Sequence, residues 1–116
     1  MNNFEVVFYE KANGEEPAKE FLLSLDEKMK IKMLRIISLL ETNGIKLRKP
    51  FSEHLEDGIF ELRAQFGSDI SRIMYFFFYG GRIILTHGFI KKTQKTPRKE
   101  IEKAKIYRDD YIKREG

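Results

Sequence analysis

The chain of 116 residues has the length of one domain, expected over 1–116, and its hydrophobic fraction of 41% favours a packed core over a disordered chain. The absence of cysteine excludes a disulfide scaffold, a thiolate metal site and a cysteine nucleophile, and His54 and His87 are too far apart for a zinc motif, so we expect no metal and no cofactor. The net charge of +4 is uneven: residues 1–43 hold six Lys/Arg against eight Asp/Glu, and residues 44–116 hold sixteen against ten. A basic half suits either a polyanionic partner such as nucleic acid or a merely solvated surface, and charge alone leaves both open.

The first 43 residues read as one strand followed by two helices. Phe4 to Tyr9 is rich in β-branched and aromatic residues, as strands are, and Asn13-Gly14 marks a turn before Pro17, which suits the first position of a helix. Helical spacing then places one set of apolar residues on a single face: Ala18, Leu22, Leu25, Met29, Met33, Ile36 and Leu40. Ser24 and Asp26 are candidate caps that divide the stretch into two helices, with Ser24-x-x-Glu27 as a capping box and an end at Asn43-Gly44.

The remainder reads as a loop, three strands and a last helix. Residues 44–58 are expected to form an irregular basic loop, followed by strands over 59–63, 70–79 and 82–90, with Gly80-Gly81 as a two-residue hairpin turn. Thr96 and Pro97 suit the N-cap and first position of a helix whose inner face carries Ile101, Ala104 and Tyr111. The order β-α-α-β-β-β-α predicts an α+β fold with a small antiparallel sheet.

No signal peptide is visible at the N-terminus, because no basic segment is followed there by a long apolar stretch. The longest apolar run, Ile73 to Tyr79, is far too short to span a bilayer. We therefore expect a cytoplasmic protein with no membrane partner.

Strand register predicts where the polar residues gather. A two-residue turn at Gly80-Gly81 pairs Met74 with His87 and Arg72 with Phe89, and the same face then carries Phe76, Phe78, Ile83 and Leu85. A four-residue loop over 66–69 would add Glu61 and Arg63 to this face, with Lys91 continuing the alternation. Two arginines directly opposite would repel, and a phosphodiester would relieve the repulsion because guanidinium groups match phosphate oxygens.

RNA cleavage by 2′-OH attack needs a base, an acid and cations that steady the pentacoordinate phosphate, and it needs no metal. His87 or a lysine could act as acid or base, Arg63 and Arg72 could hold the charge, and Glu61 could act as base or orient an arginine. Structural alternatives stay open: His87 as a packing residue, Arg72 paired with Glu61, Lys91 and Lys92 as a solvated strand end, and the aromatic run 75–79 as core.

Three segments resemble the RelE/ParE toxin superfamily: 58–63 (GIFELR), 71–76 (SRIMYF) and 85–97 (LTHGFIKKTQKTP). The last is the most specific, and the sequence is most similar to the phage-derived Gp49-like branch, which includes HigB-type toxins. The resemblance covers essentially the whole chain and implies a RelE-like fold. It also implies a ribosome-dependent mRNA endoribonuclease that binds RNA and inhibits translation. Its partner would be a HigA-like helix-turn-helix antitoxin, in a complex that we expect to be heterotetrameric and that touches promoter DNA only through the antitoxin.

The resemblance implies Arg72 as the firmest catalytic residue, then Arg63, with His87 nearest to a His or Tyr used by relatives. The strand alternation adds Lys91 to the predicted catalytic set. We expect substrate binding by Arg48, Lys49, Glu61, Phe89 and Lys92. Phe89 stands where relatives have a terminal Tyr, which leaves the general acid open. One alternative is a ParE-like inhibitor of DNA gyrase without catalysis, against which the basic set argues; another is an RNA-binding module that does not cut.

Overall fold

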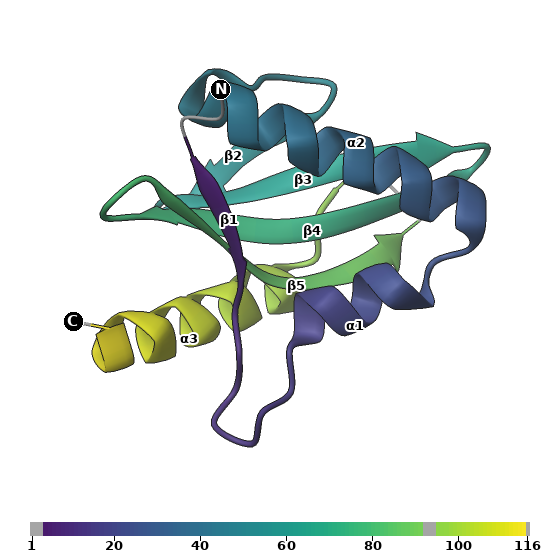
Figure 1. Cartoon of the computed structure of the whole chain (residues 1–116). Helices are drawn as coiled ribbons and strands as arrows, with labels where there is room; N and C mark the ends of the chain where they lie inside the picture. Colours follow the sequence, from purple (N-terminus) through teal and green to yellow (C-terminus); the bar gives the residue numbers. More distant parts are fainter. Residues whose placement is uncertain (1–3, 92–94, 116) are drawn as a thin grey trace.

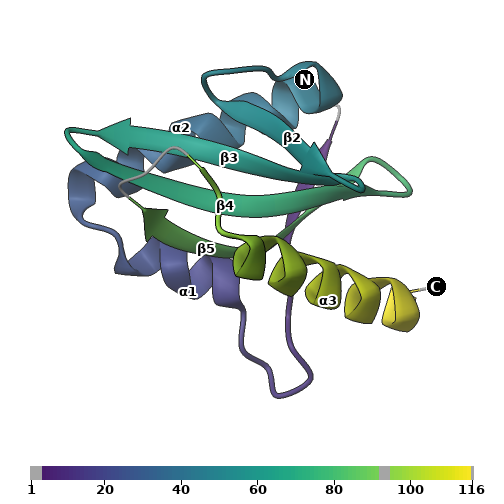
Figure 2. The same ribbon diagram turned by 180° about the vertical axis from the view of Figure 1, so that it is seen from behind.

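One five-stranded sheet, in the order β1-β5-β4-β3-β2, separates helices α1 and α2 on one face from α3 on the other (Figures 1 and 2). The computed structural model describes residues 4–91 and 95–115, and of Lys91 only the backbone. No helix within these ranges combines the length and the apolar character needed to cross a bilayer. The elements are β1 (Glu5–Phe8), α1 (Pro17–Ser24), α2 (Glu27–Asn43), the short 3-10 helix η1 (Gly44–Lys46), β2 (Ser52–Glu56), β3 (Ile59–Phe66), β4 (Asp69–Phe78), β5 (Arg82–Lys91) and α3 (Arg98–Glu115).

The helical periodicity places the core as predicted. All seven residues of the expected apolar face of α1 and α2 are buried, and they pack on sheet residues such as Leu62, Ile73 and Leu85. On the other face Ile101, Ala104 and Tyr111 of α3 cover Met74 and other sheet residues, also as predicted. β4 is the middle strand of the sheet, and helices cover both of its faces. Its sequence is almost continuously apolar because both faces are buried.

The α+β class is confirmed, but the sheet is mixed rather than antiparallel. β1 runs parallel to β5, with Glu5 opposite Arg82 and Phe8 opposite Leu85. A parallel pair needs a long connection, and α1 to β4 supply it. The other four strands are antiparallel neighbours, as expected.

The prediction of an irregular loop over 44–58 was wrong, because residues 52–56 form β2 at the edge of the sheet. This strand has no apolar run, so its pattern is weak, but it pairs with β3 through Ser52–Leu62 and His54–Phe60. Asp57 and Gly58 join the strands with φ values of 51° and 76°, the two positive values that a type I′ hairpin turn requires. That Asp-Gly dipeptide was the sequence signal for the missed strand.

The β4–β5 hairpin departs from the expected register near its turn. Phe78 pairs with Arg82, so the connection has three residues, and an extra residue, Thr86, forms a bulge opposite Met74 and Tyr75. The bulge restores the predicted pairing from Met74–His87 onward. Between the turn and the bulge the faces are therefore exchanged. Ile83 and Leu85 were predicted on the face of Arg72 and His87 but pack against α1 and α2, and Ile84 packs on the α3 side instead.

Two of the expected helix caps were wrong. Asp26 alone caps α2, accepting a hydrogen bond from the Met29 amide at 3.0 Å, while Ser24 ends α1 and donates to the Phe21 carbonyl. α3 begins at Arg98, so Pro97 rather than Thr96 directly precedes it, and the Thr96 hydroxyl donates to the Glu61 carboxylate. Thr96 thus ties the segment before α3 to the sheet.

Candidate active site

Strand pairing brings the predicted polar residues to the sheet face under α3. Arg63 lies opposite Arg72 and Glu61 opposite Met74, while Arg72 lies opposite Phe89 and Met74 opposite His87. These pairings are the predicted ones, because the bulge falls on the turn side of Met74. Glu61, Arg63, Arg72, His87 and Phe89 therefore form one cluster, which we call the polar cluster.

A carboxylate lies between the two arginines. Arg63 Nε is 3.1 Å from Glu61 Oε2, and Arg72 Nε is 3.4 Å from Glu61 Oε1. Arg72 is fully buried and Glu61 is 1% exposed, and burial raises the pKa of Glu61 although Thr96 and both arginines oppose the shift. The structural ion pair considered from sequence is thus present, and it relieves the repulsion between the arginines.

Phe89 packs beside Arg72 rather than standing free for a substrate. The Arg72 guanidinium lies 5.8 Å from the centre of the Phe89 ring, within cation–π range. This contact and the Glu61 pair offset part of the cost of burying the Arg72 guanidinium.

His87 is 4% exposed and contacts α3. Its Nε2 lies 3.0 Å from Glu100 Oε1 and its Nδ1 lies 3.2 Å from the Thr86 hydroxyl, while Tyr107 packs edge-on against the ring. Burial lowers the pKa of His87 to about 4, and the Glu100 carboxylate only partly opposes this. The imidazole is therefore neutral near pH 7 while α3 is docked.

Helix α3 covers this part of the face (Figure 2). Thr96 and Glu100 contact Glu61 and His87 directly, so the arrangement described holds Arg72 and His87 away from solvent. A phosphate cannot contact either side chain until α3 and residue Thr96 move away.

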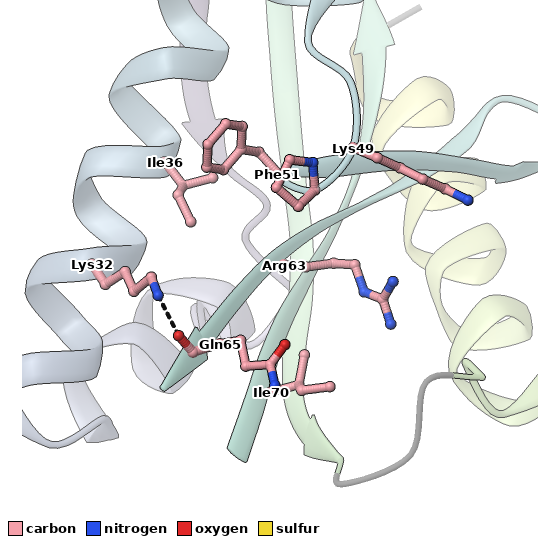
Figure 3. Close-up of a pocket in the computed structure, with 8 residues that line it drawn as sticks. Lys32, Ile36, Lys49, Phe51, Arg63, Gln65 and Ile70 are labelled. Carbon is pink, nitrogen blue, oxygen red and sulfur yellow. Dashed lines mark hydrogen bonds between the residues drawn. The ribbon is translucent and has the colours of Figure 1, made fainter. Parts of the chain in front are cut away.

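Arg63 is the arginine of the cluster that lines an open cavity. Its side chain keeps 16% of its surface exposed and lines a cavity of about 380 Å³ together with Lys49 (Figure 3). Glu53, from β2, lies 3.6 Å from Arg63 and 3.9 Å from Lys49. Arg63 and Lys49 thus line the same cavity, and Glu53 is an acidic neighbour that the sequence did not predict.

The other predicted site residues lie elsewhere. Arg48 donates to the Ile45 carbonyl at 2.9 Å and does not line that cavity. Lys91 ends β5 opposite Ile70, and Lys92 lies outside the described residues. Among the described residues no group of three or more His, Cys, Asp or Glu side chains is placed to hold a metal.

Sequence reasoning missed Glu53, Glu100 and the contact of Thr96 with Glu61. Glu53 lies opposite Glu61 on β2, so the Asp57-Gly58 turn could have found it. Glu100 and Thr96 reach the sheet through the docking of α3, for which the sequence carries no local signal.

The fold and the polar cluster together define a small α+β protein with arginines converging under its C-terminal helix. Comparison with family models matches residues 20–108 to the family described as Phage derived protein Gp49-like (DUF891). The chain therefore belongs to this phage-derived, toxin-like family. A search of curated proteins found no match.

Proposed function

We propose that the protein is the toxin of a type II toxin–antitoxin system and cuts mRNA on the ribosome. The observation that carries this proposal is the pair of arginines meeting one carboxylate on a shared sheet face. A carboxylate between two guanidinium groups occupies the place that a phosphodiester would take, since both anions suit the same donors. Membership of a toxin-like family supports the same reading.

The proposed reaction is metal-independent. The 2′ oxygen attacks the adjacent phosphorus, the bond from phosphorus to the 5′ oxygen breaks, and the products are a 2′,3′-cyclic phosphate and a 5′-hydroxyl. Arg63 and Arg72 steady the charge on the phosphorane. With α3 lifted, the exposed imidazole of His87 suits the base that takes the 2′ proton, and Lys91 or Lys92 the acid that protonates the leaving oxygen.

Catalysis by this route requires α3 to lift from the sheet. Lifting breaks the contacts of Thr96 with Glu61 and of Glu100 with His87, and it frees the buried arginine for a phosphate. In the proposal the mRNA on the ribosome stabilises the lifted state, and a HigA-like helix-turn-helix antitoxin prevents it. Translation places this activity in the cytoplasm, and promoter DNA is contacted only by the antitoxin in a heterotetramer.

Pulse labelling after induction in bacterial cells tests the proposal. Wild-type protein should stop incorporation of labelled amino acids within minutes while DNA synthesis continues. Arg63→Ala should remove this effect, because Arg63 is the cluster arginine that already reaches solvent. Lys113→Ala, which removes an exposed charge on the far end of α3, should be as toxic as wild type. Continued protein synthesis with well-expressed wild-type protein would refute the proposal.

Arg72→Ala is a less direct test than the sequence suggested. The substitution leaves the buried Glu61 carboxylate without one of its arginines, so lost toxicity would reflect fold as well as chemistry. We still expect it to abolish toxicity.

A ParE-like inhibitor of DNA gyrase is the second candidate, because the described arrangement buries both Arg72 and His87. This reading predicts that labelled thymidine incorporation fails first and that protein synthesis continues. The same labelling experiment therefore separates the two candidates.

A further inference from the structure

The cavity beside Arg63 follows an edge of β3 that β2 does not cover. β2 pairs with β3 only as far as Leu62, and the loop before it continues along the edge through a hydrogen bond from the Arg63 amide to the Phe51 carbonyl at 2.9 Å. On the other side Lys32 of α2 donates to the Gln65 carbonyl (Figure 3). The edge thus lies at the bottom of a groove between α2 and the loop.

Three cations from three separate elements line this groove. Lys32 comes from α2, Lys49 from the loop and Arg63 from β3. In Figure 3 Lys32 lies on the α2 side of β3, and Arg63 and Lys49 extend to the other side of the strand. Glu53 lies 3.6 and 3.9 Å from two of them, and Glu61, which also contacts Arg72, lies 3.1 Å from Arg63, so the three cations still outnumber the two carboxylates beside them. Such a groove attracts a polyanion.

Two aromatic rings are exposed along the same edge. Phe51 is 37% exposed and lines the cavity, and Phe66 at the end of β3 is 50% exposed. Lys28, one helical turn before Lys32, lies 5.8 Å from the centre of the Phe66 ring. Exposed rings and cations therefore both occur between the loop and the end of β3, where Phe66 lies beyond the residues that line the cavity.

We propose that this groove binds single-stranded RNA, with bases stacked on Phe51 and Phe66 and phosphates held by Lys32, Lys49 and Arg63. Exposed rings interleaved with cations are how proteins bind single strands, because every unpaired base offers a face for stacking. A duplex keeps its bases stacked on each other, and an acidic protein segment would use the cations but not the rings. The choice of RNA rests on the proposed function, and the groove would hold the strand next to the arginines that cut it.

Fluorescence anisotropy with a labelled twelve-nucleotide single-stranded RNA tests the inference on the purified chain, without ribosomes. Phe51→Leu keeps an apolar side chain and removes the ring, and we expect binding to weaken about fivefold or more. Lys32→Ala should reduce the slope of log affinity against log salt by about 0.7, the value for one phosphate contact on a single strand. Circular dichroism shows whether each variant is folded, and Phe66→Leu, at a more exposed position, provides a second test of stacking.

Two matched controls carry the same chemical changes far from the groove. Tyr79→Leu removes a ring that is 85% exposed at the β4–β5 turn, and Lys113→Ala removes an exposed charge on α3. Both should bind RNA as wild type does. Equal affinity and salt dependence in wild type, Phe51→Leu, Phe66→Leu and Lys32→Ala would overturn the inference, and so would binding of a poly-glutamate peptide without binding of RNA.

The RNA-binding test of the groove and the translation-arrest test of the proposed function can fail independently. Translation arrest by Phe51→Leu and Lys32→Ala with unchanged RNA affinity would overturn the groove and leave the toxin reading in place. Weaker RNA binding by these variants, with a wild-type protein that does not arrest translation, would support the groove and refute the toxin reading.

Discussion

At the scale of single residues, Glu61 organises the polar cluster because it meets Arg63, Arg72 and Thr96. The sequence could place these side chains on one face through strand register, and the structure confirms that pairing. It could not show that a carboxylate would be enclosed between the arginines, because enclosure depends on Thr96, which arrives with α3. The consequence is that the cluster stabilises the fold while the helix is docked.

Glu61→Gln keeps the shape of the side chain and removes its charge, leaving the buried Arg72 without its carboxylate. We expect the free energy of unfolding to fall by about 3 kcal/mol or more, measured by urea denaturation. Glu53→Gln, which alters a partly exposed pair, should cost less than about 1 kcal/mol. The double variant Glu61→Gln/Arg72→Met should recover part of the lost free energy of unfolding. Equally small losses in Glu61→Gln and Glu53→Gln would contradict the role of Glu61 as the stabilising partner of Arg72.

His87 makes stability depend on pH. Its pKa, about 4 in the folded protein because of burial, lies below the unfolded value of about 6.5, so the unfolded chain binds more protons between these values. Stability is therefore full above pH 6.5 and is lost as the pH falls towards 4, by about 2 kcal/mol at pH 5.

The check for His87 is denaturant unfolding of wild type and His87→Gln at pH 7 and pH 5. The free energy of unfolding should fall more on acidification in wild type than in the variant. The difference in this free energy between the two proteins is therefore smaller at pH 5 than at pH 7. Burial raises the pKa of Glu61, which acts in the opposite direction, but that contribution is common to both proteins and cancels. A gap that stays constant would show that His87 takes up no proton on unfolding.

At the scale of elements, α3 covers the polar cluster through Thr96 and Glu100. Its own helical pattern was readable from the spacing of Ile101, Ala104 and Tyr111, all of them buried. Its position over Glu61 and His87 was not readable, since a helix pattern gives the buried face but not the strand residues beneath it. Ion pairs of Arg98 and Lys105 with Glu56 hold the helix to β2.

Ala104→Arg should loosen α3, because Ala104 is fully buried against the sheet and the position has no room for a long charged side chain. We expect faster amide hydrogen exchange throughout α3, with β3 and β4 still protected. Ile106→Arg, at a position 65% exposed on the same helix, should exchange as wild type does. Unchanged protection of α3 in Ala104→Arg would mean that the helix is not held by this contact.

At the scale of the whole molecule, periodicity and turn residues were enough to predict the α+β class, both apolar helix faces and the register around Arg72. They were not enough for the parallel pairing of β1, which is non-local, or for β2, whose polar residues pair only because β3 offers an edge. The Thr86 bulge was hidden because a turn of two residues and a turn of three with a bulge give the same pairing beyond it.

The central claim is that this protein breaks RNA by 2′-OH attack during translation. The most direct measurement is the mapping of transcript ends in a purified translation mixture, with wild-type protein and with Arg63→Ala. We expect new internal 5′-hydroxyl ends and 2′,3′-cyclic phosphates with wild type, and intact transcripts with Arg63→Ala. Intact transcripts with the folded wild-type protein, or new ends carrying a 5′-phosphate, would contradict the claim.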